Sequence, residues 1–291
     1  MTPPSPSFRL SRFGVVRRCG AGLLGLLMLS APFISVPAIA CPSDVRPAPP
    51  LALAQAAKVR AEGRPLRILA IGSSTTAGAG ASRTATNYPS QLALRLEAAL
   101  GEGSVEITNA GVNGESAPAT LRRLEAFLKT PPVPDLVLWQ VGTNDVIFGG
   151  DPVRLKQLVG EGLDAIAAAG AAVLVIDQQY YPAILNLDRY EGFVAAVGAA
   201  ASERGAPLLP RYLMMKQWAA QDPAGLRATL AWDHFHSNDK GYACLADLLA
   251  PAIVAAMAVP AAAPQGPSQA KATPAKGATN AKQPAAAPAM R

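Results

Sequence analysis

Short apolar runs and longer segments of helical period alternate through the middle of the chain. The apolar runs suit strands that are buried on both faces, and they lie at 66–72, 105–111, 135–142 and 171–178, with a weaker run at 206–210. In the segments between and after them, apolar residues recur every three or four positions, which predicts helices over 88–100, 117–129, 152–170, 188–205 and 239–257. This alternation predicts an α/β fold in which one parallel sheet carries helices on both faces.

The two ends of the chain differ from this middle part. Residues 1–40 hold arginines, the apolar run "GAGLLGLLMLSAPF" and the small residues "AIA", which predicts a signal peptide that is cleaved after Ala40. An uncleaved membrane anchor is the alternative, although prolines interrupt the run. We expect residues 41–65 to form a linker segment, 66–259 the folded domain and 260–291 a disordered tail rich in Ala, Pro and Lys.

The basic charge of the chain is a property of its ends. The chain carries 26 Lys and Arg against 20 Asp and Glu, but eight of the basic residues lie in 1–40 and 261–291, where no acidic residue occurs. The middle part therefore holds 18 basic residues against 20 acidic ones. Nucleic-acid binding needs basic charge on the folded domain, so we do not expect a nucleic-acid partner.

Cleavage after Ala40 leaves two of the three cysteines, Cys41 and Cys244. An exported protein meets an oxidising periplasmic or extracellular environment, so we predict a disulfide between them. Two alternatives are open: a lipid on Cys41, for which "AIAC" is a weak acceptor sequence, and two free buried thiols. Membrane association is expected only through the signal segment or such a lipid.

The first apolar run ends in "GSSTTAG", residues 72–78. A phosphate-binding loop would need a lysine here, and a dinucleotide loop would need a glycine spacing that is absent. A G-x-S-x-G nucleophile elbow is excluded because Thr76 occupies its last position. On these residues alone, the segment is either a turn or the site of a serine nucleophile, Ser73 or Ser74.

Candidate partners for such a serine follow the second and third runs and precede the last helix. Gly114 in "NAGVNGES" could open the following helix and point its N–H at an incoming oxygen, and Asn144 in "VGTND" could donate its side-chain amide. Either residue could equally be an ordinary turn residue. Asp233 and His236 in "WDHFHSNDKGY" are three positions apart, so the carboxylate can reach a ring nitrogen of the histidine. Zinc binding is a weak alternative, because the chain has only two histidines.

Taken in order, these four segments resemble the sequence blocks of the SGNH (GDSL-like) hydrolase superfamily, over about residues 66–255. The resemblance implies a flavodoxin-like three-layer α/β/α fold with a central parallel sheet of about five strands. It also implies ester or thioester hydrolysis without a metal or cofactor. Its motifs assign Ser74 as nucleophile, Asp233 and His236 as its catalytic partners, and Ser74, Gly114 and Asn144 as the oxyanion hole.

One residue departs from the pattern of the superfamily: Ser73 stands where aspartate is usual. That aspartate does not accept the proton, so we expect the chemistry to survive, with Ser73 bonding the loop. The expected substrates are small-molecule or glycan esters, with "QQYYP" at 178–182 either lining the pocket or anchoring a surface loop. The alternatives are an acyltransferase and a non-catalytic glycan-binding protein. The sequence does not predict the oligomeric state.

Overall fold

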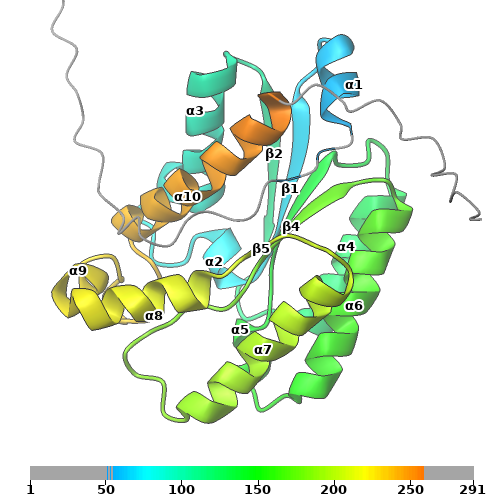
Figure 1. Ribbon diagram of the computed structural model, residues 1–291. Coiled ribbons are helices and arrows are strands. Elements are labelled where there is room, and N and C mark those ends of the chain that lie inside the picture. Colours follow the sequence, from blue (N-terminus) through cyan, green and yellow to red (C-terminus); the bar gives the residue numbers. More distant parts are fainter. Residues whose placement is uncertain (1–50, 52, 54, 259–291) are drawn as a thin grey trace, which may run out of the picture. The chain divides into compact units, whose positions relative to one another are not determined.

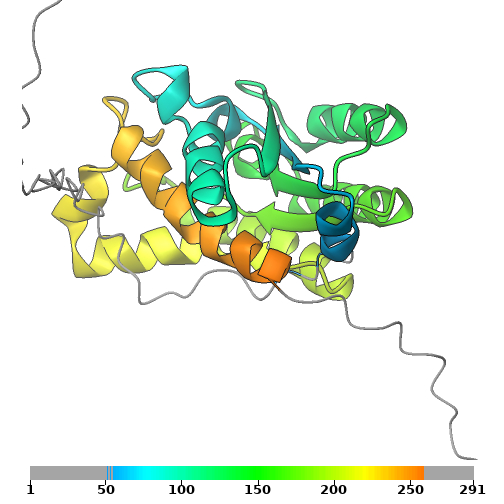
Figure 2. The ribbon, with the colours of Figure 1, turned by 90° about the horizontal axis from the view of Figure 1, so that it is seen from above.

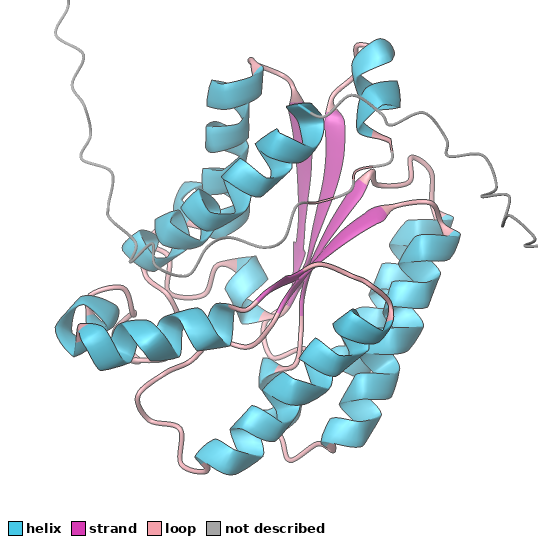
Figure 3. Ribbon diagram, viewed as in Figure 1, coloured by secondary structure: helices cyan, strands magenta, loops and turns pink. Residues whose placement is uncertain are grey.

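The computed structural model describes residues 51, 53 and 55–258, and within them five parallel strands form one sheet (Figures 1 and 3). The strands are β1 (Leu66–Gly72), β2 (Val105–Gly111), β3 (Leu136–Gln140), β4 (Ala172–Ile176) and β5 (Leu208–Leu209). Their order across the sheet is β2-β1-β3-β4-β5, which is the flavodoxin-like arrangement. The predicted α/β fold with about five parallel strands is therefore confirmed.

Helices cover both faces of the sheet (Figures 1 and 2). One face carries α3 (Tyr88–Leu100) and α10 (Asp239–Ala258), and the other carries α4 (Ala117–Lys129), α6 (Pro152–Ala168) and α7 (Leu187–Glu203). Shorter helical elements complete the described part: α1 (Ala56–Ala61), α2 (Ser74–Ala77), η1 (Thr84–Thr86), α5 (Thr143–Ile147), α8 (Arg211–Gln221) and α9 (Pro223–Arg227).

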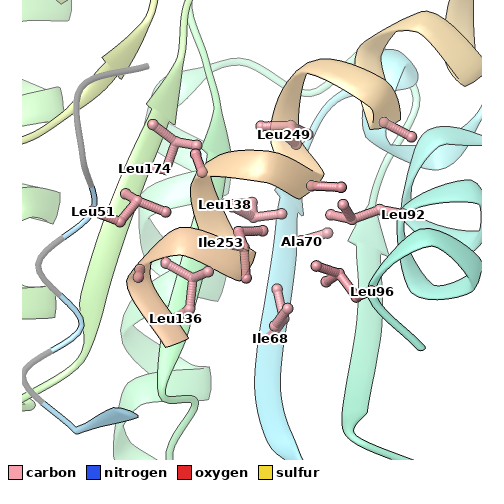
Figure 4. Close-up of a cluster of buried hydrophobic side chains, with 14 of the residues drawn as sticks. Leu51, Ile68, Ala70, Leu92, Leu96, Leu136, Leu138, Leu174, Leu249 and Ile253 are labelled. Atoms are coloured by element: carbon pink, nitrogen blue, oxygen red, sulfur yellow. The ribbon is translucent and has the colours of Figure 1, made fainter. Parts of the chain in front are cut away.

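The core lies in two clusters, one on each face of the sheet. Alternate residues of a strand point to opposite faces, so Ile68 packs with α3 and α10, whereas Leu69 packs with α4 and α6. Figure 4 shows the first cluster, where Leu138 of β3 lies near Leu249 of α10. Full burial of one such side chain contributes roughly 1.5–3 kcal/mol. The same burial explains α10, which is apolar enough to span a membrane but is packed along α3.

The described part of the expected linker, 41–65, differs from that expectation. Its residues 56–61 form α1, and Leu51, Leu53 and Val59 are buried in the first core cluster. These three side chains remove apolar surface from water, so Leu51, Leu53 and Val59 belong to the packed domain. The expected signal peptide, Cys41 and the tail beyond residue 258 lie outside the described residues.

Candidate active site

Ser74, Gly114 and Asn144 all follow the carboxyl ends of parallel strands. Ser74 begins α2 directly after β1, Gly114 lies in the loop after β2, and Asn144 lies in α5 after β3. Such ends meet at one edge of the sheet, where ligands bind in open α/β folds. Figure 1 shows α2 and α5 at this edge. The turn between α9 and α10 brings Asp233 and His236 to the same place.

Ser74, His236 and Asp233 form a continuous chain of hydrogen-bonding groups. The His236 Nε2 lies 2.9 Å from the Ser74 Oγ. The other ring nitrogen, Nδ1, lies 2.5 Å from the Asp233 Oδ2. Ser74 is 8 % exposed, whereas the His236 and Asp233 side chains are 21 % and 25 % exposed. The serine is therefore held inside the protein while the histidine keeps access to solvent.

The turn that carries the histidine is held by its own aspartate. The Asp233 Oδ1 accepts the backbone N–H groups of Phe235 and His236, both at 3.0 Å. The Ala231 N–H closes the turn by donating to the His236 carbonyl at 2.7 Å. His234 at its tip adopts the left-handed backbone region, with φ of 54°, which is uncommon for a residue with a side chain. One carboxylate thus fixes the backbone of this turn and the ring of His236 together.

The electrostatics of Asp233 favour its charged form. Burial would raise the pKa of the Asp233 carboxyl, but the hydrogen bonds from the His236 side chain and from the backbone of Phe235 and His236 outweigh it, so the pKa is lowered. A carboxylate beside Nδ1 stabilises a proton on that nitrogen and an imidazolium when one forms. The Nε2 atom then faces Ser74 as a proton acceptor.

The two adjacent serines point to different partners. The Ser73 backbone N–H and hydroxyl both donate to the Gln140 Oε1, at 3.0 and 2.9 Å. A side chain at Gly72 would place its Cβ 2.6 Å from the Gln140 carbonyl oxygen, so the close approach of β1 and β3 requires glycine here. Ser73 is thus tied to β3, whereas the Ser74 hydroxyl faces His236. No motif in the sequence points to Gln140, the last residue of β3.

Two of the three expected oxyanion donors, Gly114 and Asn144, lie on linked segments. The Asn144 Nδ2 donates to the Glu115 carbonyl at 2.8 Å, which uses one of the two amide protons. Next to it, the Asp145 carboxylate accepts the Ala117 N–H, the first of α4, at 3.0 and 3.1 Å from its two oxygens. Burial raises the pKa of Asp145, although this backbone bond opposes the shift. Asp145 follows Asn144 in the same motif, which was a signal for this contact that the prediction did not use.

The sequence predicted that Gly114 opens the helix that follows it, and the structure shows that it does not. It lies three positions before Ala117, where α4 begins, and Ser116 precedes that helix as its N-cap. Gly114 has φ of +75°, in the region that glycine adopts at low cost, because the chain reverses there. A Cβ at this position would meet no atom within 4 Å, so the space beside its backbone is open.

The segment "QQYYP" contributes packing beneath the site. The Tyr181 ring lies edge-on to Phe235, with centroids 4.8 Å apart, and Phe235 lies edge-on to His236 at 4.7 Å. Tyr180 packs in the same way against Tyr212 at 5.9 Å. These contacts favour the anchored loop over the pocket wall. Of the two cysteines expected to pair, Cys244 is buried on α10, and Cys41 lies outside the described residues.

Comparison with known proteins identifies relatives of this chain. The model of the Non-GDSL lipase-like family matches residues 38–259. Thioesterase 1/protease 1/lysophospholipase L1 of Escherichia coli is 30 % identical over 159 residues, which cover 53 % of this chain and 73 % of the relative. Esterase TesA of Pseudomonas aeruginosa is 32 % identical over 149 residues, covering 50 % and 70 %. The crystal structure of AlinE4, an SGNH-hydrolase family esterase, is 26 % identical with a TM-score of 0.50, covering 66 % and 96 %.

Proposed function

The chain belongs to the Non-GDSL lipase-like family, within the SGNH hydrolases, and is a carboxylic ester hydrolase; we propose that it is an exported serine esterase. The observation that carries the proposal is the hydrogen-bonded chain from Asp233 through His236 to Ser74. In this proposal, Ser74 is the nucleophile, His236 the general base and acid, and Asp233 the residue that orients the ring.

The acylation step begins when the Ser74 Oγ attacks the carbonyl carbon of the ester. The Nε2 of His236, at 2.9 Å, accepts the hydroxyl proton as the new C–O bond forms. The Asp233 carboxylate stabilises the imidazolium through Nδ1. The same proton then passes to the leaving alcohol as the ester C–O bond breaks, which leaves an acyl group on Ser74.

Negative charge gathers on the carbonyl oxygen during the attack. We assign its stabilisation to the backbone N–H groups of Ser74 and Gly114 and to the amide of Asn144. Ser74 is the first residue of α2, so no earlier carbonyl of that helix accepts its N–H. The second amide proton of Asn144 is the one assigned to the oxyanion. Water, deprotonated by His236, then attacks the acyl group and releases the acid.

The proposed substrates are acyl or acetyl esters of small molecules or glycans. The relatives with thioesterase, lysophospholipase and esterase names support ester and thioester substrates with an acyl chain. The proposed reaction needs no metal or cofactor, because every proton and electron pair in it moves between Ser74, His236, the substrate and water.

We also propose that the protein is exported, with cleavage after Ala40 and a disulfide between Cys41 and Cys244. The apolar run and the "AIA" sequence at 38–40 support the cleavage site. Mass spectrometry of the mature protein tests both proposals. We expect a mature chain that starts at Cys41 and gains the mass of two hydrogen atoms when the disulfide is reduced. Retention of Met1 would contradict the cleavage. A lipid on Cys41, or a mass that does not change on reduction, would contradict the disulfide.

The activity itself is tested with p-nitrophenyl esters of increasing acyl length, beside acetylated glycans. The wild-type protein should release p-nitrophenol, and Ser74→Ala should lower kcat by several orders of magnitude without loss of folding. Adding an alcohol acceptor separates hydrolysis from acyl transfer, because an acyltransferase would form a new ester. Wild-type protein that binds glycans but cleaves no ester would overturn the proposal.

A further inference from the structure

The Arg211 side chain is buried beneath the candidate active site. It is the first residue of α8, which follows β5, and it is 5 % exposed. Its Nη1 donates to the Thr75 Oγ1 at 3.2 Å and to the Gln179 Oε1 at 3.1 Å. Its Nη2 donates to the Ser237 Oγ at 3.3 Å. One guanidinium group therefore contacts three segments that are distant in the sequence.

Two of these contacts fall beside the proposed catalytic residues. Thr75 directly follows Ser74, and Ser237 directly follows His236. Because the two nitrogens of the guanidinium are held in one rigid plane, they fix the distance between the Thr75 and Ser237 hydroxyl groups. The serine turn and the histidine turn are thereby tied to the same group.

Gln179 reinforces this link between the two turns. Its Oε1 accepts the Thr75 hydroxyl at 2.9 Å, and its Nε2 donates to the Phe235 carbonyl at 3.1 Å. Phe235 directly precedes His236. The backbone carbonyl of Gln179 accepts the Tyr190 hydroxyl at 2.7 Å, which holds the start of the loop after β4 in place. Arg211 and Gln179 thus span the same two turns by separate routes.

Arg211 forms no ion pair with the described residues. Among residues 51, 53 and 55–258, no carboxylate lies within 4.0 Å of its guanidinium, which donates hydrogen bonds to a threonine, a glutamine and a serine. Burial lowers the pKa of Arg211, and the charge of the more distant Asp177 carboxyl opposes this shift without reversing it. Burial of a guanidinium that contacts no carboxylate is costly. A neutral apolar side chain would fill this place at less cost, so a role in folding alone does not explain an arginine here.

We propose that Arg211 is a positioning residue that holds the Ser74 turn and the His236 turn in register for proton transfer. The inference rests on the proposed function. The Ser74 Oγ and His236 Nε2 are 2.9 Å apart, and their turns share hydrogen bonds through Arg211 and Gln179. A displacement of reacting groups by about 1 Å can lower a rate by about 100-fold. Loss of the guanidinium should therefore slow the reaction while substrate binding is retained.

The test measures kcat and KM on a short p-nitrophenyl ester for Arg211→Lys and Arg211→Met. Each kcat is divided by the fraction of molecules that a fluorophosphonate probe labels at saturation, so misfolded protein does not count. We expect kcat per labelled site to fall by about 30- to 100-fold, with KM within about three-fold of wild type. Arg211→Lys should rescue little of this loss, because an ammonium group lacks the rigid planar set of N–H donors that contacts both turns.

The matched control is Arg64→Met. Arg64 also donates two hydrogen bonds across the fold, to Asp135 at 2.6 and 2.8 Å, but it lies before β1, at the opposite end of that strand from Ser74. This variant should lower the melting temperature and leave kcat per labelled site within about two-fold of wild type. A merely structural role for Arg211 would give the same pattern, and that outcome would overturn the proposal.

Single-contact variants keep the proposal testable if Arg211→Met does not fold. Ser237→Ala and Thr75→Val each remove one partner of the guanidinium and leave the charge in place. The double variant should lower kcat per labelled site by at least about ten-fold, and a loss below about two-fold would overturn the proposal. Failure of the proposed function is a separate outcome, because wild-type protein would then show neither ester hydrolysis nor labelling.

Discussion

The Nε2 of His236 lies 2.9 Å from the Oγ of Ser74, although 162 positions separate the two residues in the sequence. Ser74 reaches this place because β1 ends at Gly72 and α2 begins two residues later. His236 reaches it because Asp233 closes a turn just before α10. The short distance between the two side chains depends on the packing of α10 against the face of the sheet to which Ile68 and Ala70 of β1 point.

The difference between the adjacent serines gives the first prediction. Ser73→Ala removes the hydroxyl bond to Gln140 but keeps the backbone N–H bond to the same oxygen. We expect a loss of stability of about 1 kcal/mol and a fall in kcat of about ten-fold or less. Urea unfolding and steady-state kinetics measure the two effects. A fall in kcat as large as that of Ser74→Ala would contradict the indirect role of Ser73.

The second prediction concerns Asn144. Asn144→Ala removes the proposed oxyanion donor and the hydrogen bond to the Glu115 carbonyl. We expect kcat to fall by about 100- to 1,000-fold, with a loss of about 1 kcal/mol in stability. The control is Asn87→Ala, which removes the cap that accepts the Ser90 N–H at the start of α3. It should cost about 1 kcal/mol of stability and leave kcat unchanged. Equal effects of the two variants on kcat would argue against an oxyanion role.

The third prediction concerns the acidic member of the triad. Asp233→Asn keeps an oxygen that can accept the backbone N–H groups of Phe235 and His236, but it presents no charge to Nδ1. The ring loses its orienting carboxylate and the stabilisation of its charged form, so kcat should fall by about 10⁴-fold. Steady-state kinetics at neutral pH, with circular dichroism to verify folding, measure the effect. A variant that keeps a tenth of the wild-type rate would exclude Asp233 from the triad.

The fourth prediction concerns the pH dependence of stability. Burial raises the pKa of the Asp177 carboxyl to about 7, against the opposing backbone bond from Tyr212 and the charge of Arg211. In the unfolded chain an aspartate has a pKa of about 3.9. At a pH between about 4 and 7, the Asp177 carboxyl therefore holds a proton in the native state that it has lost in the unfolded state. The protonated Asp177 carboxyl therefore adds its full contribution to the free energy of unfolding below about pH 4. That contribution is lost as the pH rises towards 7.

The variant Asp177→Asn tests this dependence, because its amide oxygen can still accept the Tyr212 N–H but does not titrate. Its stability relative to wild type should rise by about 2.5 kcal/mol between pH 5 and pH 8. Urea unfolding of both proteins at the two pH values gives the difference. An equal difference at pH 5 and pH 8 would show that the carboxyl does not titrate in this range.

Much of the fold could be predicted from local sequence patterns. The helices over 88–100 and 117–129 agree with α3 and α4, because each has a long periodic apolar face and a proline at its second residue. The strands over 66–72 and 105–111 agree with β1 and β2. The short helices α2 and α5 were not predicted, because four or five residues are too few to show a helical period. The packing of Leu51 and Leu53 could not be predicted, because the prolines and alanines around them show no strand or helix pattern.

The site could be predicted only where its chemistry lies in a short motif. Asp233 and His236 are three positions apart, so their contact follows from a local turn. The side chains that hold the turns in place are different, because their partners are distant in sequence. Gln140 bonds Ser73 across 67 positions, and Arg211 bonds Thr75 across 136. Such contacts are set by which strands are neighbours in the sheet, and no spacing in the sequence encodes them.

Covalent labelling tests the central claim most directly, because it identifies the atom that attacks. A fluorophosphonate probe reacts with an activated serine, and mass spectrometry of the digested protein locates the adduct. The account predicts a single adduct on Ser74 in the wild type and in Ser73→Ala, with no adduct in Ser74→Ala. An adduct on Ser73, or labelling that persists in Ser74→Ala, would contradict it.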